Sequence, residues 1–366
     1  MAKLSVTNYL SFLIVIPAIC FSETDWRGHN RFIGTSYHGI GREHSYEFSQ
    51  GQLVLNHRSD FIYSSEKHQF EAAYELFATE NKNIPADPNS DFKYRIKDLN
   101  YSLVKSDQDF LVIQNLDRFY YTYFGDKFEL NLGRQAVGFG SARTINPLDI
   151  LVPFDFLMIN IEQKLGVDAI RTKIPFKQTG MVEFGISASE DVPFEDEYRF
   201  ISFLQNDIRF LYQELNQHKV WGLDIQKSLL GWGTWLELGH FDIHEGENFL
   251  RYSVGGQYQF PNELSFFVEY HQNGSRVLHR DLGIFVTNRD YLNWGLDYQV
   301  TPLNKVALSS FNSLNDPSSL LNLNYELNFE ENWYFDCSLY YGVGNKNASE
   351  FGSYPEIVSF NLKNFF

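Results

Sequence analysis

The sequence predicts an all-β protein, a transmembrane antiparallel β-barrel of about sixteen strands. Apolar and polar residues alternate with a period of two over short segments that recur along the whole chain. The connections between these segments alternate between short turns and long loops, as in barrels that are trimmed at one end. No apolar run long enough for a helical membrane span follows residue 22, so the membrane face is expected in the alternation itself.

The composition fits an exported membrane barrel and excludes other classes. The chain is acidic, with 46 Asp and Glu against 30 Lys and Arg and a net charge of −16, which argues against nucleic acid as a partner. Aromatic residues make up 17% of the 366 residues. Of the two cysteines only Cys337 lies beyond residue 22, so the exported chain is not expected to contain a disulfide within itself.

Residues 1–22 have the features of a secretory signal peptide. Lys3 supplies the positive charge, and an apolar run over residues 10–19 is too short to span a bilayer. We expect cleavage after Ser22 and a single outer-membrane barrel domain over residues 23–366. The cell outer membrane of a Gram-negative bacterium is the expected location.

The strands are expected wherever one face of the alternation is apolar and the other holds Asn, Gln, Ser, Asp, Glu or Gly. Residues 321–329 give the clearest example, with Leu, Tyr or Phe at every odd position and Asn or Glu at every even one. A soluble sandwich also alternates in this way. The aromatic ends of the apolar faces and the closing alternation up to Phe366 favour the barrel. The sixteen expected strands are 31–40, 50–62, 69–79, 112–124, 127–138, 166–175, 180–189, 219–230, 233–243, 249–260, 264–274, 290–300, 305–314, 320–329, 332–343 and 355–366.

The connections sort into two lengths. We assign the short ones to the periplasmic end: 64–68, 124–127, 176–180, 230–233, 260–264, 301–305 and 329–332. We assign the long ones to the extracellular end: 41–49, 80–111, 140–165, 189–218, 244–248, 273–290, 312–319 and 342–354. An even strand number places both termini in the periplasm and leaves no open edge in lipid. Eighteen strands also close evenly, with one more strand within 92–104 and another within 202–213.

The segment from Phe128 to Phe156 breaks this rhythm of hairpins. It and its flanks contain Asp117-Arg118, Gly133-Arg134-Gln135, a glycine-rich exit, Asn146-Pro147-Leu148-Asp149 and Gly166-Val167-Asp168-Ala169-Ile170-Arg171. These motifs resemble a family of porin-like outer-membrane barrels grouped with the alginate-export barrels. The dense match covers about sixty residues, and Phe139 stands where many relatives have Trp. The resemblance implies a passive channel or an export barrel and names no solute.

We interpret residues 140–165 as a loop that leaves the wall and folds into the lumen. Gly138 and Gly140 permit positive φ angles at the exit, and Asn146 can cap the turn that Pro147 begins. Arg134 shares the face of Leu130 and Leu132, so it points inward only if a bulge near Gly133 resets the register. The candidate residues for a pore constriction or for anchoring of the loop are Asp117, Arg118, Arg134, Gln135, Arg143, Asp149, Asp168 and Arg171.

The sequence offers little for catalysis. His271, Asn273 and Ser275 suggest the residue types of a membrane-embedded lipase, but their spacing does not match one. The ten histidines are scattered without ligand spacing. We expect no enzyme activity, no metal and no cofactor.

Two functions therefore remain. The first is a porin-like channel for passive transport of small hydrophilic solutes. Its lumen would carry a mild cation preference, since the inward-facing set Asp224, Glu237, Glu269, Asp297, Glu326 and Asp336 outnumbers Arg251 and Lys363.

The alternative is a non-conducting barrel for envelope assembly, surface attachment or export, with the lumen filled by long loops. Expected partners in either case are outer-membrane lipid, lipopolysaccharide and the barrel-insertion machinery, which would bind the C-terminal strand ending at Phe366. The sequence leaves homo-oligomer formation open.

Overall fold

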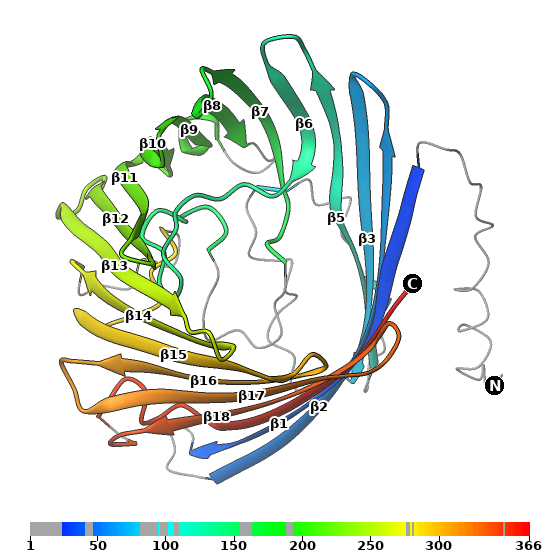
Figure 1. The fold of residues 1–366 in the computed structure, drawn as a ribbon, viewed down its shortest axis with the longest axis vertical. Coiled ribbons are helices and arrows are strands. Elements are labelled where there is room, and N and C mark those ends of the chain that lie inside the picture. Colours follow the sequence, from blue (N-terminus) through cyan, green and yellow to red (C-terminus); the bar gives the residue numbers. More distant parts are fainter. Residues whose placement is uncertain are drawn as a thin grey trace.

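The protein is an eighteen-stranded antiparallel barrel that closes on itself (Figure 1). The structure, a computed structural model, describes residues 24–40, 47–80, 94–95, 102–105, 110–153, 163–187, 193–275, 279, 282–346 and 348–366. The expected signal peptide lies outside the described residues.

Within these described residues there are nineteen strands and one short 3-10 helix. The first nine strands are β1 (Thr24–Ile40), β2 (Glu47–Ser64), β3 (His68–Glu80), β4 (Ser102–Lys105), β5 (Phe110–Phe124), β6 (Glu129–Gln135), β7 (Val167–Phe176), β8 (Gly180–Ser187) and β9 (Tyr198–Gln205), the last preceded by η3 (Phe194–Asp196). The others are β10 (Ile208–Leu215), β11 (His218–Leu229), β12 (Trp232–Asp242), β13 (Phe249–Gln259), β14 (Leu264–Asn273), β15 (Asp290–Thr301), β16 (Asn304–Ser313), β17 (Ser318–Glu330), β18 (Trp333–Val343) and β19 (Glu356–Phe365).

The barrel closes between its first and last strands. β1 pairs with β2 on one side and with β19 on the other, from His29 opposite Phe365 to His38 opposite Glu356. The remaining strands pair with their neighbours in chain order, except that β3 pairs with β5. β4 is the nineteenth strand and pairs only with β5, so it stands outside the ring of eighteen.

The expected asymmetry of the two ends is confirmed. The end that carries Thr24 and Phe365 has short turns throughout, including 65–67, 206–207, 230–231 and 331–332. The opposite end carries the long connections, among them 136–166 and 274–289.

The sixteen expected strands are all present, and the two that complete eighteen both lie in one region. Residues 189–218 were expected as a single extracellular loop, and that prediction is wrong. They contain β9 and β10, joined by Asn206-Asp207 at the short-turn end and followed by Asn216-Gln217 at the other. The eighteen-strand alternative also placed a strand within 92–104. The structure has β4 at the end of that range, and residues 96–101 and 106–109 lie outside the described ones.

The distribution of polar and apolar side chains is the inverse of that in a soluble protein. In β2 the side chain of Leu55 is 48% exposed, whereas the next residue, Asn56, is 2% exposed. Apolar side chains of this kind cover the exterior, for example Leu53, Ile170, Ile201, Phe210, Trp221, Leu292 and Phe360. Polar side chains fill the interior, for example Glu75, Asn131, Glu183, Gln213, Asn293 and Asn361. Nowhere in the described part of the chain does a helix reach the length and apolar character that a membrane crossing requires.

Candidate functional site: a segment held inside the barrel

The chain leaves the barrel wall at the end of β6 and runs through the interior (Figure 1). β6 has only seven residues and pairs with β5 at residues 119–124. Further along β5, residues 111–113 pair with β4 instead of β6. Gly140 has a φ of +98° at the exit, as expected, whereas Gly138 has no positive φ. We call residues 136–153 the inner segment; residues 154–162 lie outside the described ones.

Two buried glutamates of the wall hold the main chain of the inner segment. Glu237 of β12 accepts hydrogen bonds from the backbone N–H groups of Ser141 (2.9 Å), Ala142 (2.9 Å) and Leu148 (2.6 Å). Both glutamates are 0% exposed.

Glu269 of β14 does the same for the adjoining residues. It accepts from the backbone N–H groups of Arg143 (2.6 Å), Thr144 (3.2 Å) and Ile145 (3.1 Å), and from the indole Nε1–H of Trp235 (2.9 Å). Consecutive backbone N–H groups that converge on one carboxylate form an anion-binding concavity, and charge-assisted bonds of this kind are the strong ones. The inner segment is therefore fixed through its backbone.

Each of the six neighbouring strands β10 to β15 contributes a side chain to this attachment. Besides the two glutamates, Gln213 Nε2 donates to Leu148 O (3.0 Å) and Ser253 Oγ donates to Ile145 O (2.6 Å). Asn293 Nδ2 donates to Thr144 Oγ1 (2.8 Å), and Ser141 Oγ donates to Asp224.

The turn within the inner segment is built as the sequence predicts. Asn146 Oδ1 accepts from the backbone N–H groups of Leu148 (3.1 Å) and Asp149 (3.0 Å), while Asn146 Nδ2 donates to Phe139 O (2.9 Å). Capping by Asn followed by Pro147 is the expected arrangement for a chain that starts a turn.

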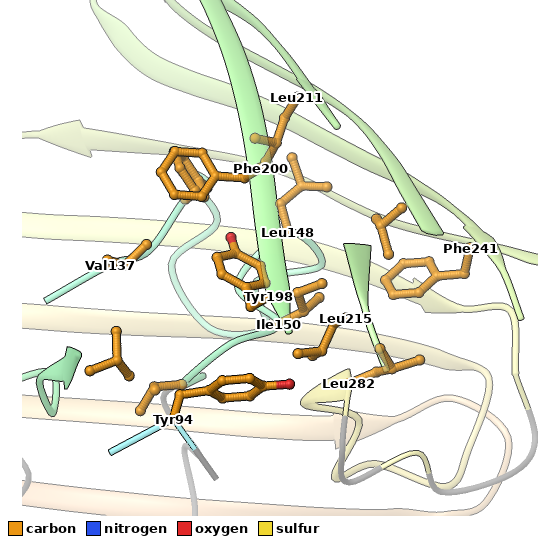
Figure 2. Close-up of a cluster of buried hydrophobic side chains, with 14 of the residues drawn as sticks. Tyr94, Val137, Leu148, Ile150, Tyr198, Phe200, Leu211, Leu215, Phe241 and Leu282 are labelled. Atoms are coloured by element: carbon orange, nitrogen blue, oxygen red, sulfur yellow. The ribbon is translucent and has the colours of Figure 1, made fainter. Parts of the chain in front are cut away.

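An apolar cluster fills the space between the inner segment and the wall (Figure 2). Val137, Leu148 and Ile150 of the segment pack against inward side chains of β9 to β12, and Leu282 comes from the connection before β15. The wall residues are Tyr198, Phe200, Leu211, Leu215, Val220 and Phe241. This part of the lumen is consequently closed by a dry core.

A second anchoring network surrounds Asp117 on β5. Ala73 pairs with Arg118 and Tyr74 pairs with Leu116, so Asp117 is an extra residue in a β-bulge. Neighbouring residues of a regular strand point to opposite faces. Because of the bulge, the consecutive residues Asp117 and Arg118 are both buried, at 1% and 8% exposure.

The Asp117 carboxylate binds three arginines and one amide. Its oxygens lie 2.9 Å from Arg58 Nη1, 3.3 Å from Arg95 Nη2 and 2.8 Å from Arg118 Nη1, and they accept from the backbone N–H of Gly166 (3.1 Å). Arg118 also donates to Lys164 O. Asp117 and Arg118 thus connect the barrel wall to Lys164 and Gly166, which lie just before β7.

Arg134 and Asp168 form a separate pair. Pairing of β6 with β5 and β7 runs through Gly133 without a register shift, so Arg134 keeps the parity of Leu132, which is exposed on the exterior. The Arg134 side chain is 0% exposed, and its Nη2 lies 2.8 Å from Asp168 Oδ2. Gln135 Nε2 donates to Ala169 O (3.1 Å). These residues join strands at the point where β6 ends.

Arg143 and Asp149 lie within the inner segment itself. Arg143 is partly exposed, with its Nη2 3.5 Å from Asp297 Oδ2 and its guanidinium 4.6 Å from the Phe267 ring centroid. Asp149 pairs with Lys164. Burial lowers the pKa of Lys164, and Asp149 offsets part of that effect.

Arg171 pairs with Glu183 of β8. Of the predicted residues, Arg143 is therefore the one on the inner segment with an exposed side chain, and the others mainly connect parts of the structure. Sequence reasoning missed Arg58 and Arg95 as partners of Asp117. It also missed Glu75, whose Oε1 lies 3.0 Å from Arg58 Nη1. It assigned Glu237 and Glu269 to ion selectivity.

A cavity of about 710 Å³ lies away from the apolar cluster. Arg27, Arg58, Arg118 and Lys164 contribute basic groups to its lining, and Asp60 and Glu71 contribute acidic ones. Gly28, Phe365 and Phe366 place it toward the short-turn end. The inner segment thus fills one side of the lumen and leaves a charged space on the other.

The three side chains that suggested a lipase, His271, Asn273 and Ser275, are all buried. His271 Nδ1 lies 2.8 Å from Ser253 Oγ, and both side chains are completely buried under the inner segment. In the part of the chain that the structure describes, no group of three His, Cys, Asp or Glu side chains is placed to hold a metal ion.

A closed barrel with a polar interior and an inner segment held against one wall has the architecture of porins. No family model and no curated protein matches the sequence. Among solved structures, OccAB4 of Acinetobacter baumannii is similar at a TM-score of 0.58 and 10% identity, covering 96% of this chain and 100% of that one. OccK7 (OpdD) of Pseudomonas aeruginosa is similar at 0.56 and 9% identity, covering 94% and 99%. A mutant of the Rh. blastica porin is similar at 0.50 and 11% identity, covering 94% and 100%. At these identities the likeness establishes the fold.

Proposed function

We propose that the protein is an outer-membrane channel of the porin type for passive passage of small hydrophilic solutes. The inverted polarity of the closed barrel carries this proposal. A closed barrel satisfies every strand hydrogen bond within the wall, which is the condition for a β-structure in lipid. The exposed apolar exterior suits a hydrocarbon environment, and the polar interior suits water and solutes.

The inner segment acts as a fixed constriction in this proposal. It is attached to β10–β15 by hydrogen bonds and by the apolar cluster, so that side of the lumen is closed to solutes. The charged cavity beside Arg27, Arg58 and Arg118 is a space that the described residues leave open, and in this proposal it supplies the path.

Deletion of residues 145–156 tests the channel against the alternative of a plugged barrel. We expect the wild-type protein to conduct in planar bilayers and the deletion variant to conduct more, because the constriction is removed. Single-channel recording of both proteins measures this. Deletion of residues 245–247, in an exposed loop between β12 and β13, is the matched control and should leave the conductance unchanged. If the wild-type protein does not conduct and the deletion variant does, the inner segment is a plug and the channel proposal is contradicted.

The location and assembly of the protein complete the proposal. Residues 1–22 serve as a signal peptide, and N-terminal sequencing of the protein from purified outer membranes should begin at Glu23. The C-terminal strand ending at Phe366 is the segment that the insertion machinery would bind. Phe366 packs on Trp26 of β1, with ring centroids 5.4 Å apart, so the terminal residue belongs to the barrel seam.

A further inference from the structure

A fully buried arginine, for which the described residues provide no counter-ion, lies beneath the inner segment. Arg251 of β13 is 1% exposed, and neither its Nε nor its Nη1 has a hydrogen-bond partner among the described residues. Its guanidinium is 5.8 Å from the centroid of the Phe241 ring. A buried charge without a partner is strongly unfavourable, so a compensating group is expected nearby.

The described part of the chain supplies no carboxylate for this purpose. Glu237 is the acidic residue whose charge acts on Arg251. Its two oxygens, however, already accept three backbone N–H groups of the inner segment. No ion pair within 4 Å joins Arg251 to an acidic residue in the described ranges. The described residues therefore leave the charge of Arg251 without a counter-ion.

A small cavity provides the room. Its volume is about 20 Å³, enough for one water-sized particle. Arg251 is the charged member of its lining. The other lining residues come from the inner segment (Thr144, Ile145, Asn146, Pro153) and from the connection before β15 (Gly283, Phe285, Val286).

We propose that Arg251 binds a small monovalent anion, such as chloride, in this cavity. The ion lies where the wall, the inner segment and the connection before β15 meet. It neutralises Arg251 and joins the three parts, so it stabilises the constriction without lying in the solute path.

A single water is the competing occupant. Two acceptors on the facing strand, His271 Nε2 and Asn273 Oδ1, also have no donor among the described residues, but neither residue belongs to the cavity lining. Charge favours the anion, because a water leaves the Arg251 cation uncompensated.

Bromide soaking of crystals of the full-length mature protein distinguishes the two. We expect an anomalous bromide peak within hydrogen-bond distance of the Arg251 guanidinium in the wild type. The peak should be lost in Arg251→Met, which keeps the length and removes the charge. It should be retained in the control Arg209→Met, an inner-face arginine of β10 that donates to Ser202. Water-level density without an anomalous signal in the wild type would overturn the proposal.

Thermal unfolding in detergent gives an independent readout. A ligand that binds only the folded state raises the melting temperature with its concentration. We expect the apparent Tm to rise by a few degrees, about 2–4 °C, when sodium gluconate is replaced by sodium chloride at equal ionic strength. The rise should vanish in Arg251→Met and persist in Arg209→Met. A wild-type Tm that is the same in both salts would contradict the anion.

Discussion

Single buried carboxylates decide where the inner segment lies. Glu237 and Glu269 look in the sequence like ordinary inward-facing residues of alternating strands, and we counted them toward cation selectivity. In the structure they bind backbone N–H groups from a segment about a hundred residues earlier in the chain. No local pattern marks a carboxylate whose partners are main-chain groups. The arginine and aspartate motifs were recognisable because their members lie close together in sequence.

Glu237→Gln and Glu269→Gln should each loosen the inner segment. One carboxylate oxygen becomes an NH₂ group that faces backbone donors, and an unsatisfied buried donor costs about 1–3 kcal/mol. We expect a lower free energy of unfolding and larger current fluctuations in single-channel recordings. Glu326→Gln, at a half-exposed lumen position on β17, is the control. Equal fluctuations in all three variants would contradict the anchoring role.

At the scale of elements, β9 and β10 show why a strand can escape prediction. Their outward side chains include Ile201, Phe203 and Phe210, as in the other strands. Their inward side chains at the long-loop end are also apolar, because they pack on the inner segment (Figure 2). The alternation of polar and apolar residues is therefore lost where a second core lies inside the barrel. A prediction from period two fails at such strands.

The β9–β10 hairpin depends on a two-residue turn with positive φ at both positions. Asn206 and Asp207 have φ of 51° and 65°. This is the geometry that favours Asn followed by Gly. Asn206→Val should destabilise the barrel by about 1 kcal/mol or more, since a β-branched residue disfavours positive φ. Asp207→Gly should be neutral or stabilising. Apparent Tm values in detergent measure both, and the same sign for the two variants would contradict this account.

At the scale of the whole molecule, the lumen charges divide into bound and accessible sets. Asp224, Glu237 and Glu269 are buried in bonds to the inner segment, so half of the acidic set that suggested a cation preference does not face solutes. The cavity lining also contains Arg27, Arg58, Arg118 and Lys164 against Asp60 and Glu71. Of these basic groups, Arg58 and Arg118 are bound to Asp117 and Lys164 is bound to Asp149, so Arg27 is the exposed one. The sequence predicted which residues face inward, whereas the fold of the inner segment determines which of them remain in contact with water.

Arg27→Glu should shift ion selectivity toward cations. Arg27 is an exposed residue of this cavity, and it has no ion-pair partner among the described side chains. Reversal potentials in a KCl gradient measure the shift. Lys67→Glu reverses a charge at the exposed 65–67 turn, outside the cavity lining, and should change the reversal potential much less. A larger effect of Lys67→Glu would place the selective region elsewhere.

The attachment of the inner segment through its backbone has a consequence for how such a protein can change. Glu237 and Glu269 bind N–H groups that nearly every amino acid possesses, so their hold on residues 141–145 depends little on which side chains stand there. Substitutions at Arg143, whose side chain points away from this attachment toward Asp297 and Phe267, can alter what the lumen presents while the loop keeps its position. In the proposed channel, single substitutions at Arg143 would change the lumen surface while the segment keeps its place, which makes this position a natural starting point for engineering permeability.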